Sequence, residues 1–502
     1  EGVVVADGCV VGEQARIRRG VRVWPNKEVE DGATVTSSLV WGERWTRSLF
    51  GRYGVSGLAN LELSPEFASR LGAAYGALLG KGATVATSRD LHKASRMVNR
   101  SLICGLMSVG TNVHDLRGVP LPVSRFAVGA SGERGGVHVR RSPRHTKTLE
   151  ITFLDEQGLN LAPAREKSLE QLFAREDFPR ADMDETGTLS FPERVAERYA
   201  EAYLKAIPFR SSVASHTKLV VDYTHGVTAP IFTAILGRLG VEVISRNADF
   251  SGRQSAMEPA ELKTSLAELG QIVRHVHADA GVALDPEGEK VSLIDDRGRV
   301  LAGDVGLAVW VSLVARAARQ RGPVRGARIG VPVTASRVVE RIAAREGVAI
   351  RRTRTSPRDL DEVAREKGTL AVLDENGSVI FPEFLAAPDG MFAVGKLLEL
   401  LTATGRQLSE VVDRIPPFRV EHLAVPCEWE KKGTVMRRIM EFAKGRRVEL
   451  LDGVKLYRRG AWVLLLPDAD RPAFHVYAET AGGRGAGALV REFSGRIRAW
   501  AA

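Results

Sequence analysis

A short basic segment around one serine is the first place where residue types could do chemistry. Ser142 lies among four cationic side chains, which are Arg140, Arg141, Arg144 and Lys147. Such cations bind phosphate through charge-assisted hydrogen bonds, so the segment could hold a phosphate group beside the serine hydroxyl. A serine is a weak nucleophile unless a neighbour activates it. An ordinary serine in a solvated basic turn is the alternative interpretation.

Acidic residues alternate in a second segment. Asp285, Glu287 and Glu289 directly follow an apolar run. On an extended loop such alternate side chains point to one side, so the three carboxylates would meet. Oxygen ligands of this kind suit Mg²⁺, although long glutamate side chains and the stiff Pro286 fit its octahedral geometry poorly. We therefore expect weak Mg²⁺ binding or none, and a solvated acidic turn is the alternative.

Other catalytic classes have no matching pattern in the sequence. The ten histidines do not cluster at zinc-ligand spacing, and His275 and His277 alternate on an apparent strand without a third ligand. The three cysteines, Cys9, Cys104 and Cys427, lie far apart, as is typical of free thiols. Neither a complete Gly-x-x-x-x-Gly-Lys-Ser/Thr phosphate loop nor a Gly-x-Ser-x-Gly elbow occurs.

The elements that must position these residues alternate between strands and helices after Trp45. One helix begins where Ser64 precedes a proline, which combines an N-cap with a favoured first helical residue. The expected strands and helices include residues 83–86, 94–105, 218–222, 229–239, 327–333 and 336–346. This alternation is typical of parallel α/β domains, so we expect three similar α/β units and a smaller α+β region after them.

Residues 1–44 carry an internal repeat of six residues. An aliphatic side chain returns at every sixth position, at Val5, Val11, Ile17, Val23, Val29 and Val35. A strand with one buried face would alternate with a period of two. The longer period favours a β-helix, in which short strands stack identical side chains inward.

Length and charge limit the remaining classes of function. A chain of 502 residues exceeds the size of a single hydrophobic core, so several domains are expected. No apolar run approaches the ~20 residues that span a bilayer, and we expect a cytoplasmic protein without a membrane partner. The net charge is +10, but acidic residues are interleaved with the arginines. We therefore expect no nucleic-acid partner, and anion binding of that kind is only a third hypothesis.

Four short motifs occur in a collinear order along the chain. They are Leu49-Phe50-Gly51, Ser88-Arg89-Asp90, the segment 221–226 (Val-Asp-Tyr-Thr-His-Gly) and the segment 280–285 (Ala-Gly-Val-Ala-Leu-Asp). Together they resemble the α-D-phosphohexomutase superfamily, which includes phosphoglucomutase and phosphomannomutase. The resemblance implies three mixed-sheet α/β domains and a smaller α+β domain IV, at residues 45–185, 186–304, 305–414 and 415–502.

The resemblance also implies roles for individual residues. Members of this superfamily move phosphate between C1 and C6 of a hexose through a phosphoserine, with the help of Mg²⁺. The position of the phosphoserine corresponds to Ser142. The implied metal ligands are Asp285, Glu287 and Glu289, the implied substrate-binding residues are Glu375, Ser378 and Lys290, and the implied phosphate-binding residues are Arg140, Arg141, Arg144 and Arg471.

The four segments that contain these residues all depart from the superfamily pattern. In the phosphate loop, 466–472, Leu466 replaces an arginine, and Asp468 and Asp470 replace hydroxyl donors. Each carboxylate facing a phosphate dianion at ~4 Å would cost roughly 1–4 kcal/mol. We therefore expect a catalytically degenerate module that senses a sugar phosphate, or regulates or assembles with another domain. An active phosphomannomutase or phosphoglucomutase is the alternative hypothesis.

The repeat at residues 1–44 resembles the left-handed β-helix of sugar-nucleotide pyrophosphorylases. That resemblance implies a fusion of the mannose-1-phosphate guanylyltransferase type. We therefore expect earlier coils and a nucleotidyltransferase domain upstream, and a homo-oligomer is a further expectation, because such helices often pack as symmetric multimers. Hexose phosphates are the expected ligands.

Overall fold

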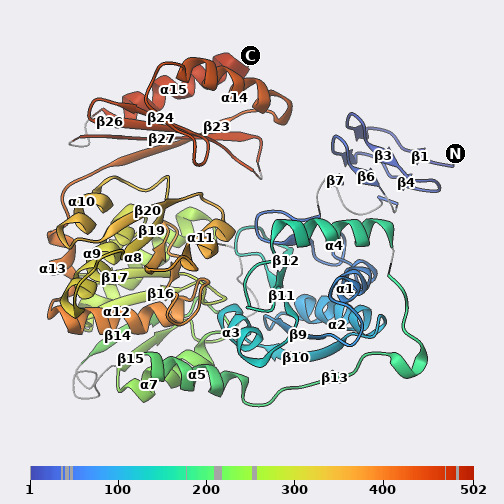
Figure 1. The fold of residues 1–502 in the computed structure, drawn as a ribbon, viewed down its shortest axis with the longest axis horizontal. Coiled ribbons are helices and arrows are strands. Elements are labelled where there is room, and N and C mark those ends of the chain that lie inside the picture. Colours follow the sequence, from blue (N-terminus) through green and yellow to red (C-terminus); the bar gives the residue numbers. More distant parts are fainter. Residues whose placement is uncertain are drawn as a thin grey trace. The chain divides into compact units, whose positions relative to one another are not determined.

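The structure is a computed structural model of the chain. It describes residues 2–35, 38–39, 44–45, 49–176, 178–207, 217–250, 257–469, 471–481 and 485–501. The chain divides into two compact units (Figure 1). The first contains residues 1–201, 225–229 and 249–261, and the second contains residues 202–224, 230–248 and 262–502. Within the described residues, no helix has both the length and the apolar character needed to cross a membrane.

The six-residue repeat at the N-terminus forms a series of two-residue strands. They are β1 (Val4–Val5), β2 (Val10–Val11), β3 (Arg16–Ile17), β4 (Arg22–Val23), β5 (Glu28–Val29) and β6 (Thr34–Val35). Their parallel pairing joins β1 to β4, β2 to β5 and β3 to β6, so partners such as Val5 and Val23 lie three repeats apart. This pairing supports a β-helix, whose assignment and left hand stay predictions.

The aliphatic ladder of this segment is buried only in part. Val23 is 1% exposed, whereas Val5 is 45% and Val11 is 42% exposed. The described strands β1 and β2 each pair on one edge only, with β4 and β5. The inward burial expected for the whole ladder is therefore not found at its first repeats, because no described coil covers them.

The first α/β domain contains a six-stranded sheet in the order β13-β10-β9-β11-β12-β8. Its strands are β8 (Val55–Leu58), β9 (Thr84–Arg89), β10 (Asn112–Gly118), β11 (Gly135–Arg141), β12 (Thr148–Leu154) and β13 (Leu189–Ser190). Its helices are α1 (Pro65–Leu79), α2 (Lys93–Met107), α3 (Leu121–Ser131) and α4 (Pro163–Arg175). The predicted start of α1 is confirmed, because Ser64 Oγ accepts the Phe67 N–H at 3.3 Å.

The second and third α/β domains repeat this plan. The second sheet, β15-β14-β16-β17-β18, contains β14 (Lys218–Asp222), β15 (Glu242–Arg246), β16 (Ala280–Leu284), β17 (Val291–Asp295) and β18 (Val300–Leu301). The third sheet, β20-β19-β21-β22, contains β19 (Arg328–Pro332), β20 (Ala349–Thr353), β21 (Thr369–Leu373) and β22 (Val379–Ile380). The helices are α5 (Val195–Ala206), α7 (Ala229–Leu239), α8 (Pro259–His275), α9 (Asp304–Arg321), α10 (Val338–Arg345), α11 (Pro357–Ala364), α12 (Gly390–Thr404) and α13 (Leu408–Asp413).

Three candidate loops occupy equivalent places in the three sheets. In each sheet the last strand of the parallel part, β11, β16 or β21, is followed by an antiparallel return strand, β12, β17 or β22. The loops of these hairpins are residues 142–147, 285–290 and 374–378. The repeated plan therefore places Ser142, the acidic segment 285–290 and Glu375 at the same kind of hairpin.

The C-terminal domain is an antiparallel sheet in the order β23-β27-β26-β25-β24. Its elements are β23 (Val420–Pro426), α14 (Trp429–Ala443), β24 (Val448–Glu449), β25 (Val454–Arg458), β26 (Ala461–Pro467), β27 (Ala473–Thr480) and α15 (Ala486–Ala501). The helices α14 and α15 cover one face of this sheet (Figure 1). On the other face Trp462, Leu464 and Leu466 pack against Val333 of the third α/β domain, as the period of two in β26 requires.

One local prediction is wrong. His275 and His277 do not alternate on a strand, because His275 is the last residue of α8 and His277 has a positive φ of 50° in the turn after it. Val273, in the last turn of α8, and Val276, in the turn after the helix, pack in the core of the second α/β domain.

Candidate functional site

Ser142 begins the loop between β11 and β12, in the first unit. Its backbone N–H donates to the Thr148 carbonyl at 2.9 Å and so closes the hairpin. The residue is fully buried. Its Oγ donates to Glu150 Oε1 at 2.8 Å and accepts the backbone N–H groups of Arg144 and His145, both at 3.2 Å. A hydroxyl has one proton and two lone pairs, so these three contacts use its whole hydrogen-bonding capacity.

Glu150 is a buried carboxylate that no motif in the sequence revealed. It lies in β12 directly opposite Arg140 of β11 and is 2% exposed. Arg140 donates from Nε to Glu150 Oε2 at 3.1 Å, and Arg144 donates from Nη2 to Oε1 at 2.5 Å. A buried charge is tolerated when it is paired and hydrogen-bonded, and here two guanidinium groups and one hydroxyl meet that condition.

The other predicted phosphate ligands of this loop also have partners inside the first unit. Asp90 Oδ2 accepts the Arg141 N–H at 2.8 Å and lies 3.5 Å from Arg141 Nε. The Arg144 guanidinium lies 3.3 Å from the centroid of the Tyr53 ring, in a cation–π contact. The loop is thus cationic, as the sequence predicts, and two buried carboxylates of the same domain offset part of its charge.

The acidic segment 285–290 folds into a turn. Asp285 and Lys290 are joined by two contacts, because the Asp285 N–H donates to the Lys290 carbonyl at 3.1 Å and Asp285 Oδ1 accepts the Lys290 N–H at 2.9 Å. Gly288 takes a positive φ of 74° within the turn. Glu287 and Glu289 are 4% and 9% exposed.

The three carboxylates of this turn are the predicted magnesium ligands. Among the residues that the structure describes, no three His, Cys, Asp or Glu side chains form a group that could hold a metal ion. Asp285 Oδ1, which the sequence suggests as a ligand, is occupied by a backbone amide. In the described turn the three carboxylates are not gathered around one point, as octahedral Mg²⁺ requires. The roles of Asp285, Glu287 and Glu289 as ligands stay predictions.

The predicted substrate residues of the second unit lie in two neighbouring loops. Lys290 and Ser378 are brought together by an antiparallel bridge, and Asp374 Oδ1 accepts the Ser378 N–H at 2.7 Å. Glu375 Oε1 accepts the Thr334 hydroxyl at 2.8 Å. Burial, with Asp374 nearby, raises the pKa of Glu375 to about 7. A carboxyl group that titrates near neutrality can either accept a hydrogen bond from a sugar hydroxyl or donate one to it.

The segment 466–472 is held by Asp468 and by two side chains outside it, Lys432 and His475. Asp468 Oδ1 accepts the Arg471 N–H at 3.1 Å, and Asp468 Oδ2 lies 2.9 Å from His475 Nε2. Lys432 Nζ donates to the carbonyl oxygens of Asp468 and Arg471 at 2.6 and 2.5 Å. The Arg471 residue is exposed, and Asp470 lies outside the described residues. The aspartate that replaces a hydroxyl donor therefore stabilises the turn from within.

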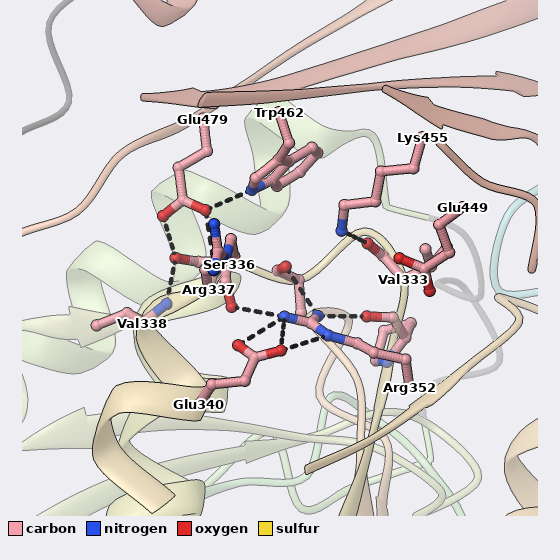
Figure 2. Close-up of polar contacts among 12 residues, drawn as sticks. Val333, Ser336, Arg337, Val338, Glu340, Arg352, Glu449, Lys455, Trp462 and Glu479 are labelled. Carbon is pink, nitrogen blue, oxygen red and sulfur yellow. Dashed lines mark hydrogen bonds and ion pairs between the residues drawn. The ribbon is translucent and has the colours of Figure 1, made fainter. Parts of the chain in front are cut away.

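A second serine–glutamate pair joins the third α/β domain to the C-terminal domain (Figure 2). Ser336 Oγ donates to Glu479 Oε1 at 2.6 Å and accepts the Val338 N–H at 3.0 Å. Glu479 Oε2 also accepts the Arg337 N–H at 2.9 Å and the Trp462 indole N–H at 2.7 Å. All four of these donors are neutral groups.

A buried lysine lies beside this pair in Figure 2. Lys455 Nζ donates to the Val333 carbonyl at 2.6 Å and lies 4.0 Å from the centroid of the Trp462 ring. Desolvation lowers the pKa of Lys455 to about 7. Neither Lys455 nor Glu479 was predicted from the sequence. The face of β25 and β27 that points away from α14 and α15 also carries His475 and two tyrosines, so polar type alone does not single out Lys455 and Glu479.

Comparisons with known proteins agree with this architecture. Three family models match: phosphoglucomutase/phosphomannomutase α/β/α domain I at residues 47–180, domain II at 197–298 and domain III at 308–418. The chain is 30% identical over 437 residues to a phosphoglucomutase/phosphomannomutase of Thermococcus kodakarensis, and the match covers 86% of this chain and 94% of that protein.

Two solved structures share the fold. A phosphoglucomutase/phosphomannomutase family protein of Burkholderia thailandensis superposes with a TM-score of 0.78 at 21% identity, covering 91% of this chain and 98% of that chain. An N-acetylphosphoglucosamine mutase of Aspergillus fumigatus, solved in complex with GlcNAc-6P and magnesium, has a TM-score of 0.59 at 13% identity, with coverages of 90% and 96%.

Proposed function

Because the chain belongs to the phosphoglucomutase/phosphomannomutase family, we propose that it binds hexose phosphates without interconverting them. A mutase serine must offer a lone pair to the phosphorus atom of a sugar bisphosphate. The observation that carries the proposal is the state of Ser142, whose buried hydroxyl is saturated by Glu150 and two backbone amides. Attack on phosphorus would first have to release the lone pairs that the two backbone amides occupy.

The remaining loops support ligand binding more than turnover. Glu375, Lys290 and Ser378 supply hydrogen-bonding groups of the kind that recognise sugar hydroxyls and phosphate. In the segment 466–472, by contrast, Asp468 is engaged with His475 and a backbone amide. A protein with these features can recognise a hexose phosphate while lacking the activated serine and the phosphate loop of a mutase.

The role that follows is sensing, regulation or assembly in sugar-nucleotide metabolism. The paired short strands of the first 44 residues support a β-helix like that of sugar nucleotidyltransferases. We therefore propose that the protein acts beside a mannose-1-phosphate guanylyltransferase-type domain in the cytoplasm, and that it forms a homo-oligomer. Co-purification with such a transferase and light scattering test the two parts of this proposal separately.

A coupled mutase assay tests the proposed lack of turnover. The protein is incubated with glucose, mannose or N-acetylglucosamine 1-phosphate, Mg²⁺ and the matching bisphosphate, beside its Ser142→Ala variant. We expect no turnover in either protein, together with a rise in thermal unfolding temperature when hexose phosphate is added. Turnover that disappears in Ser142→Ala would overturn the proposal, and the absence of any ligand-dependent shift would remove the sensing role.

An active mutase is the second candidate, and one contact favours it. At 2.8 Å from Ser142 Oγ, Glu150 Oε1 is within reach of the serine proton. Glu150 would take that proton as the Oγ–P bond forms and the sugar O–P bond breaks, and would return it to the sugar oxygen. The same carboxylate binds two guanidinium groups, which compete with the proton for its oxygens. We therefore favour the first proposal.

A further inference from the structure

We propose that the Glu150 carboxylate occupies the place of a phosphate group in the Ser142 loop and acts as a built-in anion that keeps this loop closed to phosphate. The inference rests on the proposed lack of turnover and names the residue responsible for it. It concerns one hairpin of the first unit, β11 and β12, and the loop between them.

The donors around Glu150 are those that bind a phosphate group. The Ser142 hydroxyl and the guanidinium groups of Arg140 and Arg144 all donate to its two oxygens, at 2.5–3.1 Å. Guanidinium groups are the favoured partners of phosphate oxygens, and a hydroxyl is the usual third donor. The oxygens of a phosphoryl group on Ser142 would lie within about hydrogen-bond distance of Oγ, and Glu150 Oε1 lies at a similar distance, 2.8 Å, from the same atom.

The position of Glu150 is set by the sheet. It is the cross-strand partner of Arg140, and the hairpin is closed two positions further on by the bond from the Ser142 N–H to the Thr148 carbonyl. The carboxylate is thus tethered at its binding position, and a tethered group competes at a far higher effective concentration than a free ion. Because Glu150 is 2% exposed, a dissolved phosphate cannot add to the cluster without displacing it.

Charge points to the same conclusion. Three arginines in or beside the loop, Arg140, Arg141 and Arg144, form ion pairs with two buried carboxylates, Glu150 and Asp90. Thr148 and Thr152, the neighbours of Glu150 on the same face of β12, are neutral. Removal of Glu150 takes from Arg140 and Arg144 the carboxylate that they share, and the desolvation cost of buried cations then favours uptake of an outside anion.

The test uses the full chain, inorganic phosphate as the probe, and the variants Glu150→Gln and Glu150→Ala. Glu156→Gln is the matched control, because Glu156 is an exposed partner of Arg165 in the same domain, at 3.1 Å. Calorimetric titration should show phosphate binding to both Glu150 variants at least about tenfold tighter than to the unaltered protein, consistent with a new charge-assisted site. Glu156→Gln should behave as the unaltered protein does.

A further substitution locates the bound anion. Combining Glu150→Gln with Arg144→Ala should abolish the gain in phosphate affinity. Folded Glu150 variants that bind phosphate no more tightly than the unaltered protein would contradict the inference. If the variants do not fold alone, phosphate should restore their folding, and variants that stay unfolded with and without phosphate also contradict it.

The outcome is separable from that of the mutase assay. Ser142-dependent turnover by the unaltered protein removes the proposed function, whatever phosphate does to Glu150→Gln. An inactive protein whose Glu150 variants gain no phosphate affinity removes only the role of Glu150.

Discussion

Two buried serine–glutamate pairs, one in each unit, have the same local geometry and different surroundings. Ser142 donates to Glu150 at 2.8 Å, and Ser336 donates to Glu479 at 2.6 Å. Each serine oxygen also accepts the backbone N–H two residues further on. Ser336 holds two domains together, so the shared geometry is that of a structural serine. The serine at the position of the phosphoserine thus has the contacts of a residue that shapes the backbone.

The two pairs differ in the charge of the groups that donate hydrogen bonds to the glutamate. Glu150 is bound by two guanidinium groups, whereas Glu479 is bound by a hydroxyl, an indole N–H and a backbone N–H. Removing one partner of a buried ion pair leaves an uncompensated charge, whereas removing the acceptor of neutral donors leaves only unsatisfied dipoles. The first pair should therefore be the more costly one to break.

The largest effect is expected for Glu150→Ala. Loss of the shared carboxylate should destabilise the β11–β12 hairpin by about 3–5 kcal/mol, because Arg140 and Arg144 lose a buried partner. Hydrogen exchange of the hairpin amides measures this local free energy of opening. The control Glu156→Ala, at an exposed pair, should cost less than about 1 kcal/mol. Equal losses of stability for the two substitutions would contradict the expectation that burial makes the Glu150 pair costly to break.

A smaller effect is expected for Glu479→Ala at the domain junction. Three neutral donors lose their acceptor, so the free energy of unfolding of the second unit should fall by about 1–3 kcal/mol. Denaturant unfolding followed by tryptophan fluorescence measures it. Glu492→Ala, which removes the half-buried partner that Arg458 and Arg496 share near the protein surface, is the control. A loss of stability larger than that caused by Glu150→Ala would contradict the expectation that the charged pair is the more costly one to break.

These pairs also mark the limit of what the sequence could predict. The bounds of β14 and α7 agree with the prediction, because a turn follows Asp222 and a glycine follows Leu239. Local signals of this kind specify the α/β units and the loops between strands. Glu150 resembles a residue on the solvated face of a strand, and only the register with Arg140 shows that it is buried.

Long-range contacts were beyond local patterns for the same reason. Ser336 and Glu479 are separated by 143 positions, and no spacing rule connects them. The acidic segment was expected to be extended, but the bonds between Asp285 and Lys290 fold it into a turn. In both cases partners that are chosen by the tertiary fold decide the geometry.

Stability should depend on pH through Lys455, which lies beside the neutral pair. Its pKa is lowered from 10.5 to about 7 by desolvation, so between these values the unfolded chain holds a proton that the folded chain has lost. The free energy of unfolding should therefore rise with pH from about 7 to 10.5, by up to about 1.4 kcal/mol per pH unit.

Denaturation of the unaltered protein and of Lys455→Met from pH 7 to pH 9 measures this slope, which the variant should lack. Exposed Lys444→Met is the control and should keep it. Glu375 has the opposite sign, because its raised pKa makes the folded chain hold the proton, and its contribution falls from about pH 4.5 to 7. A slope that survives in Lys455→Met would show that the lysine is not desolvated.

The smallest effects are expected for the serines themselves. Ser142→Ala and Ser336→Ala each remove one hydroxyl donor and the acceptor for a backbone N–H, so each should cost about 1 kcal/mol. Hydrogen exchange of the loop amides at 144–145 and at 338 reports the two losses side by side. A Ser142→Ala variant that is more stable than the unaltered protein would mark Ser142 as strained for function and not as structural.

The central claim is that the Ser142 hydroxyl is held by Glu150 and does not accept a phosphoryl group. Its most direct test is the intact mass of the purified chain after incubation with glucose 1,6-bisphosphate and Mg²⁺, followed by peptide mapping of residues 140–150. We expect Ser142 to stay unmodified at every time point. Phosphoserine at Ser142 that is consumed when glucose 1-phosphate is added would contradict it and establish the protein as a working mutase.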